Sequence, residues 1–153
     1  MQIVQLTKEG LEKLKVELKF LLDVKRSEVA KRIQVARENG DISENAEYDA
    51  ARLEQSTVES RIGELEEIVR NAKISDAKID KNVVGLGAKV TVHIDGDEDT
   101  FHVVGTPEAN PLQKRISHES PLGIALLGKK VGEKVGVDAP IGKLIYTIKR
   151  IDY

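Results

Sequence analysis

The apolar residues in the first half of the chain recur at helical spacing. Between positions 8 and 38 they follow one another in steps of three and four, with one step of seven: Leu11, Leu14, Leu18, Leu22, Val29, Ile33 and Ala36. The phase shifts slightly near Leu18 to Leu22. A second series has steps of seven, four, three, four and three: Ala51, Val58, Ile62, Leu65, Val69 and Ala72. This spacing is a heptad seam, so the pattern predicts two long amphipathic helices.

Local signals and charge predict that these helices form a hairpin. Thr7 suits the N-cap of the first helix, and Asn39-Gly40 is a helix-stop signal. Residues 8–38 hold nine Lys/Arg and six Asp/Glu, whereas residues 44–72 hold three Lys/Arg and eight Asp/Glu. A basic helix beside an acidic one, joined by a short turn, indicates an antiparallel coiled coil. Residues 1–76 are therefore expected to form a hairpin about 45 Å long, a better shape for a probe than for a pocket.

The second half changes from helical to alternating spacing. Residues 73–87 are expected to act as a linker and turn, and Asp95-Gly96-Asp97 is a hairpin-turn signal. The alternation predicts four strands: Lys89 to Ile94, Thr100 to Val104, Lys134 to Val137 and Leu144 to Ile151. Ser120-Pro121 suits the start of a short helix running to Leu127. Residues 77–153 are thus expected to form a small α+β domain with an antiparallel sheet.

Residues 40–48, at the tip of the predicted hairpin, concentrate acidic side chains. Asp41, Glu44 and Glu47 lie within seven positions. Asp41 and Glu44 fit a capping box, with Asp41 as N-cap of the second helix and Glu44 three residues on. Glu47 is surplus to such a cap, and the seam extends back through Tyr48 to Glu44. Because Mg²⁺ often takes only one or two protein carboxylates, a capped tip and a metal-carrying tip are compatible.

Two arginines lie close to the tip acids along the chain. Arg37 precedes Asp41 by four residues, and Arg52 is the only basic residue between positions 38 and 60. One interpretation is that both are solvated or form ion pairs across the hairpin. The other is that they hold a phosphate backbone near the carboxylates.

Composition narrows the class of protein. The chain has 153 residues, a net charge of -2, 33% charged residues, 3% aromatic residues and no cysteine. These values argue against a bulk nucleic-acid binder and exclude disulfides and thiolate metal sites. No apolar run approaches a membrane span and the N-terminus does not look like a signal peptide, so a soluble cytoplasmic protein is expected.

Several motifs in one order give the chain a specific resemblance. They are Leu6 to Gly10, Ala36 to Tyr48, Arg61-Ile62, Leu65-Glu66, Val103 to Gly105, Ile116-Ser117, Ser120 to Gly123, Ala125 to Lys129 and Tyr146 to Ile148. In these the chain resembles the bacterial Gre family of transcript-cleavage (transcription elongation) factors, and within it the GreA type. The resemblance covers nearly the whole chain.

The resemblance implies a fold and a partner. It implies an N-terminal antiparallel coiled coil and a C-terminal domain of FKBP-like fold. The second domain would dock at the rim of the secondary channel of bacterial RNA polymerase, and the coil would enter the channel. The factor would be a cytoplasmic monomer that rescues arrested, backtracked complexes.

The resemblance also implies roles for the tip residues. Asp41 and Glu44 would help to hold a second Mg²⁺ and orient a water beside the polymerase's own Mg²⁺, for cleavage of the nascent RNA near its displaced 3′ end. Arg37 and Arg52 would contact the RNA. Further residues would support the tip: Ser43, Asn45, Glu47 and Tyr48. The polymerase would supply most of the site, so neither nuclease activity nor bound Mg²⁺ is expected of the free factor.

The chain departs from the family pattern at two positions, and other functions stay open. Ile42 stands where Leu is usual, and Asp49 adds an acid beside Tyr48. One alternative is a channel-binding inhibitor without cleavage activity, although the tips of such homologues differ from the one here. A prolyl isomerase would need an aromatic-lined pocket, and residues 77–153 offer only Phe101, Tyr146 and Tyr153. A coiled-coil chaperone would need exposed apolar tips, for which Ile42 is the candidate.

Overall fold

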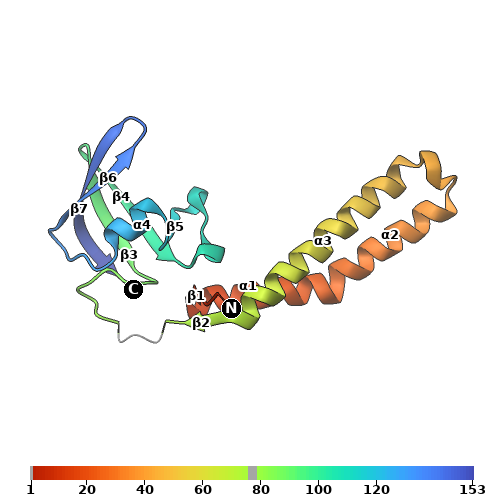
Figure 1. Ribbon diagram of the computed structural model, residues 1–153, viewed down its shortest axis with the longest axis horizontal. Helices are drawn as coiled ribbons and strands as arrows, with labels where there is room; N and C mark the ends of the chain where they lie inside the picture. Colours follow the sequence, from red (N-terminus) through yellow and green to blue (C-terminus); the bar gives the residue numbers. More distant parts are fainter. Residues whose placement is uncertain (1, 76–78) are drawn as a thin grey trace. The chain divides into compact units, whose positions relative to one another are not determined.

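The computed structural model describes residues 2–75 and 79–153, which fall into two compact units (Figure 1). The hairpin unit is Glu12–Asn71, and the sheet unit combines Met1–Leu11 with Ala72–Tyr153. The domain boundary expected between residues 76 and 77 lies outside the described residues. The fold class is α+β, as predicted from the sequence.

The first arm of the hairpin is a helix with a wider turn in its middle. It consists of α1 (Lys8–Phe20), the π-helical segment η1 (Leu21–Lys25) and α2 (Arg26–Glu38), which follow one another without a break. A π turn holds more residues than an α turn and so shifts the phase of the side chains. The change of apolar phase near Leu18 to Leu22 falls at this segment. Thr7 caps the helix as predicted, with its Oγ1 accepting from Gly10 N at 3.0 Å.

The second arm is α3 (Ala46–Asn71), which runs beside α2 (Figure 1). Val29 and Ile33 of α2 pack with residues of the predicted seam, which are buried: Ala51, Val58 and Ile62. Leu18, Leu21, Leu22 and Tyr48 cover the edges of this cluster. The heptad pattern thus correctly identified the buried face of each arm.

Ion pairs cross the hairpin as the opposite charges of its arms predicted. Arg26 Nε lies 2.8 Å from Glu59 Oε1, and Arg61 Nε lies 2.7 Å from Glu17 Oε1. The hydrogen bonds that Arg26 and Arg61 donate to these carboxylates raise the pKa of both guanidinium groups. Exposed ion pairs of this kind add little to the free energy of unfolding, but they favour this alignment of the two arms over alignments that bring like charges together.

The sheet unit is built on five strands in the spatial order β5-β4-β3-β7-β6. Their bounds are β3 (Lys89–Ile94), β4 (Asp97–Val104), β5 (Arg115–Ser117), β6 (Lys134–Ala139) and β7 (Gly142–Asp152). The four longer strands are antiparallel and match the four predicted. Asp95 and Gly96 make the predicted turn, both at positive φ, as a tight hairpin turn with right-handed strand twist requires.

Three short strands were not predicted from the sequence. β5 pairs parallel to β4, so the sheet is mixed rather than purely antiparallel. β1 (Val4–Leu6) and β2 (Ala72–Ile74) pair parallel with each other, although residues 73–87 were expected to be a linker. Three residues are too few to show alternation, and their partners are distant in sequence.

One face of the sheet buries the core of this unit. Val90, Val92 and Ile148 are fully buried there, together with Leu126 of the short helix α4 (Pro121–Leu126). Ser120 caps this helix as predicted, its Oγ accepting from Gly123 N at 3.1 Å. Two short 3₁₀ turns, η3 (Thr106–Glu108) and η4 (Pro111–Gln113), lie between β4 and β5. In the part of the chain that the structure describes, every helix is too short or too polar to cross a bilayer.

Candidate functional site

The tip of the hairpin is a separate 3₁₀ turn, not the first turn of the second arm. Asp41 is extended and caps the turn η2 (Ile42–Glu44), its Oδ1 accepting from Ser43 N at 3.0 Å. The predicted capping box, with Asp41 as N-cap of the second helix, is therefore wrong. α3 begins only at Ala46.

Asn45 is the residue that caps α3. Its Oδ1 accepts from Tyr48 N at 3.2 Å, which satisfies a free N–H of the first helical turn. Its Nδ2 donates to Ala36 O of α2 at 2.7 Å. One side chain thus joins the end of α2 to the start of α3, and the acidic turn is held between these two fixed points.

Asp41 and Glu44 are both exposed at this turn. Hydrogen bonds from the Ser43 backbone N–H and from its hydroxyl lower the pKa of Asp41. Within residues 2–75 and 79–153, neither carboxylate has an ion-pair partner. Two exposed carboxylates without a described ion-pair partner suit Mg²⁺, which fills the rest of its shell with water and phosphate oxygens.

The third tip acid, Glu47, is used differently. Its Oε1 accepts from Arg32 Nη2 at 2.9 Å, and Arg32 also binds Glu54. Lys25 Nζ pairs with Glu54 at 2.7 Å, which lowers the pKa of that carboxyl. Glu47 is therefore tied to α2 by an ion pair. The charge of the two arms predicted such pairing, but no signal in the sequence indicated these partners.

Arg37 and Arg52 differ from the arginines that bridge the hairpin. The Arg37 guanidinium lies 5.8 Å from the centroid of the Tyr48 ring, a cation–π contact. Arg52 Nη1 donates to the neutral Gln55 Oε1 at 2.9 Å. Both are exposed, and neither pairs with a carboxylate among the described residues. The sequence left open whether these arginines form ion pairs across the hairpin. In the described part of the structure, neither of them forms such a pair.

Asn45→Ala is expected to lower the free energy of unfolding of the hairpin by about 1 kcal/mol, the usual effect of losing an N-cap. Thermal unfolding followed by circular dichroism measures the loss. Asn39→Ala is the matched control, because no hydrogen bond of the Asn39 side chain is found among the described residues, and it should change stability by less than about 0.5 kcal/mol. Equal losses in the two variants would contradict the role given to Asn45.

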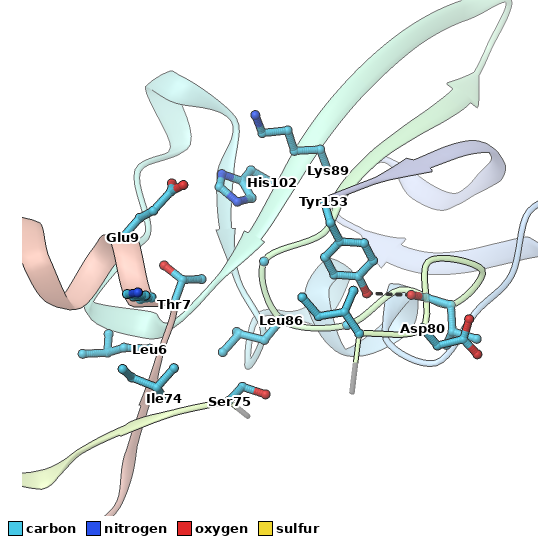
Figure 2. Close-up of a pocket in the computed structure, with 15 residues that line it drawn as sticks. Leu6, Thr7, Glu9, Ile74, Ser75, Asp80, Leu86, Lys89, His102 and Tyr153 are labelled. Atoms are coloured by element: carbon cyan, nitrogen blue, oxygen red, sulfur yellow. Dashed lines mark hydrogen bonds between the residues drawn. The ribbon is translucent and has the colours of Figure 1, made fainter. Parts of the chain in front are cut away.

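The other functions left open find little support in the described residues. Phe101 and Tyr146 pack edge to face with ring centroids 6.3 Å apart, and Tyr146 is buried, so these two rings are used in packing the core of the sheet unit. Tyr153 lines a pocket of about 480 Å³ in the sheet unit, where its hydroxyl donates to Val83 O (Figure 2). The Ile42 side chain, on which the chaperone hypothesis depends, lies outside the described part.

Comparisons with known proteins cover both halves of the chain. The model described as "Transcription elongation factor, N-terminal" matches residues 4–74, and "Transcription elongation factor, GreA/GreB, C-term" matches residues 79–153. Transcription elongation factor GreA of Bacillus subtilis (strain 168) is 48% identical over 98% of this chain and 97% of its own. Its counterpart from Lactococcus lactis subsp. cremoris (strain MG1363) is 50% identical over 96% of each chain. A solved structure, GreA factor homolog 1 of Thermus thermophilus, is 33% identical, with 99% of this chain and 100% of that one covered and a TM-score of 0.47.

Proposed function

This chain belongs to the GreA/GreB family of transcription elongation factors, and from that premise we propose that it makes bacterial RNA polymerase cleave backtracked RNA. The hairpin enters the secondary channel of the polymerase, and the sheet unit docks at the rim of that channel. The factor acts in the cytoplasm as a monomer. The observation that carries the proposal is the tip, where two exposed carboxylates in a braced turn have no ion-pair partner among the described residues, while the third is tied to α2.

The tip residues divide into ligands and supports. Asp41 and Glu44 would hold Mg²⁺ together with oxygen ligands from the polymerase and the RNA. When bound beside the polymerase's own Mg²⁺, the ion would complete a two-metal arrangement in which one ion activates a water and the other stabilises the leaving oxygen. Ser43 keeps the Asp41 carboxylate ionised and oriented, and Asn45 and Glu47 brace the turn against α2. Tyr48 packs against the hairpin core, and the Arg37 guanidinium lies over its ring.

The two exposed arginines near the tip bind the displaced RNA. Neither has a carboxylate partner among the described residues, which supports this role, because a guanidinium already paired would have to give up its partner to take a phosphate. Arg37 sits on α2 and Arg52 on α3, so the tip presents one cation from each arm.

Arg52→Ala is expected to weaken functional binding to backtracked complexes and to flatten its salt dependence. Loss of one phosphate contact should change the slope of log affinity against log salt by about 0.7. Cleavage titrations at several KCl concentrations measure the slope. Arg70→Ala is the control, since Arg70 is exposed on the same helix and lies about 27 Å from Arg52 at 1.5 Å per residue. An unchanged slope for Arg52→Ala would contradict the RNA contact.

The factor itself is not a nuclease under this proposal, because it contributes only part of a metal's ligands. Labelled RNA is incubated with Mg²⁺ and the factor alone, with polymerase alone, and with backtracked complex plus factor. Release of short 3′ fragments only in the last mixture is expected. Cleavage by the factor alone would overturn this division of the site, and slowed elongation without fragments would indicate the channel-binding inhibitor instead.

A further inference from the structure

A buried carboxylate in the sheet unit lies outside the site described above. Glu108 ends the 3₁₀ turn η3 after β4, and its side chain is only 2% exposed. It is the one charged residue among the buried side chains of the described part. Burying a carboxylate is unfavourable unless donors replace the water that it loses. Its partners therefore show what the residue holds together.

The donors to Glu108 come from two parts of the sheet unit that lie far apart in the sequence. Its Oε2 accepts from Thr7 N at 2.9 Å and from Gly105 N at 3.2 Å. Its Oε1 accepts from Thr7 Oγ1 at 2.6 Å and from Arg115 Nη2 at 3.3 Å. Thr7 is also the N-cap of α1. One carboxylate thus joins β4 and β5 of the sheet to the residue that begins the leading helix of the hairpin.

Two glycines let the backbones approach this carboxylate. A Cβ on Gly10, in the first turn of α1, would overlap the carboxyl carbon and Oε1 of Glu108. A Cβ on Gly105 would overlap the carbonyl oxygen of Gln5 in β1. We call the set of Thr7, Gly10, Gly105 and Glu108 the anchor. Its packing leaves no room for a methyl group at either glycine.

The start of α1 is packed on one side, where Leu6 and Leu11 are buried, and open on the other. Thr7, Lys8 and Glu9 border the pocket of about 480 Å³ in Figure 2, and Lys8 and Glu9 are exposed. The polar contacts of Glu108 therefore restrain this helical turn together with the packing of Leu6 and Leu11. α1 starts in the sheet unit and passes into the hairpin unit after Leu11.

We propose that Glu108 is a positioning residue for transcript cleavage. By holding the first turn of α1 in the sheet unit, it couples docking of that unit to delivery of the tip acids by the hairpin. This role rests on the proposed function. In this role Glu108 acts through Thr7 and the helix that Thr7 begins, without a contact of its own to RNA or metal.

Three substitutions break the anchor in different ways. Glu108→Gln places an NH₂ group among partners that all donate, Thr7→Val removes a hydroxyl, and Gly10→Ala inserts a methyl group. Two variants serve as controls. Thr7→Ser keeps the hydroxyl, and Gly63→Ala is the same change at a helical glycine with nothing within 4 Å of the added Cβ.

The measurement separates binding from delivery. For each variant, cleavage of backtracked complexes is titrated with factor, giving a maximal rate and a half-saturating concentration. The three anchor variants should lose about 10- to 100-fold in maximal rate, as expected for a misplaced catalytic group. Their half-saturating concentration should stay within about twofold, a factor that corresponds to only about 0.4 kcal/mol of binding free energy. Both controls should match wild type.

Amide hydrogen exchange by NMR shows independently whether the anchor has opened. The Thr7 amide, which donates to Glu108, should exchange faster in Glu108→Gln. Faster exchange with an unchanged maximal rate would overturn the proposal, as would an equal loss in Gly63→Ala. If Glu108→Gln does not fold, Thr7→Val and Gly10→Ala decide by the same criteria. Failure of wild type to stimulate any cleavage would instead overturn the proposed function, whatever the exchange rates.

Discussion

Asp41→Asn and Glu44→Gln are each expected to reduce stimulated cleavage by about 100-fold or more at saturating factor. Changing even a residue that supports a metal ligand typically lowers affinity or activity 10- to 100-fold, so losing a ligand should do at least as much. Both changes keep the size of the side chain and remove only its charge. The structure gives neither carboxylate a described ion-pair partner, so the fold should not depend on either charge.

The Mg²⁺ dependence gives this prediction a second readout. If the carboxylates bind the ion, high Mg²⁺ should partly restore cleavage by either variant. Binding to polymerase, measured by competition with labelled wild-type factor, should be unchanged. Asp49→Asn is the matched control, because Asp49 is an exposed acid near the tip to which no metal role is assigned. A loss of competition equal to the loss of cleavage would show that the tip acids act in docking.

Ile62→Ala is expected to destabilise the hairpin by about 2–5 kcal/mol, the usual range for truncating a buried Ile. Ile62 is 3% exposed and lies in the cluster formed by α2 and α3. Because a two-helix hairpin has a small core, this loss should unfold the hairpin while the five-stranded sheet keeps its own core. Cleavage should then be lost although the sheet unit remains folded.

Hydrogen exchange followed by mass spectrometry separates these outcomes. Peptides of α2 and α3 should lose protection in Ile62→Ala, and peptides of β3, β4 and β7 should keep it. Val16→Ala is the control, because Val16 is 68% exposed on α1. Loss of protection across both units together would mean that they unfold as one, contrary to the prediction.

The hairpin could be predicted from the sequence because its restraints repeat along the chain. Each apolar position of the seam indicates the same buried face. The caps are also local, because Thr7 lies at the start of α1 and Asn39 at the end of α2. The turn at Asp95-Gly96 and the cap at Ser120 are equally local. Such features need no knowledge of distant residues.

The features that sequence analysis missed depend on distant or competing partners. β1 pairs with β2 although the whole hairpin lies between them in the sequence, and Glu108 binds Thr7, which lies 101 residues before it. At the tip, Asp41 and Asn45 are both good cap residues. The structure assigns Asn45 to α3 because its amide also reaches Ala36 of α2. A sequence pattern cannot distinguish two good caps when the deciding bond is tertiary.

The most direct test of the proposal is whether the tip reaches the backtracked RNA. The chain has no cysteine, so Ala46→Cys at the start of α3 can carry a single photoreactive group. Ser60→Cys, exposed on the same helix about 21 Å away at 1.5 Å per residue, is the control. Labelled factors that still support cleavage are irradiated with backtracked complexes carrying radiolabelled RNA. Crosslinking of the RNA 3′ segment from position 46 and not from position 60 is the expected result. Equal crosslinking from the two positions, or none from position 46, would contradict delivery of the tip to the RNA.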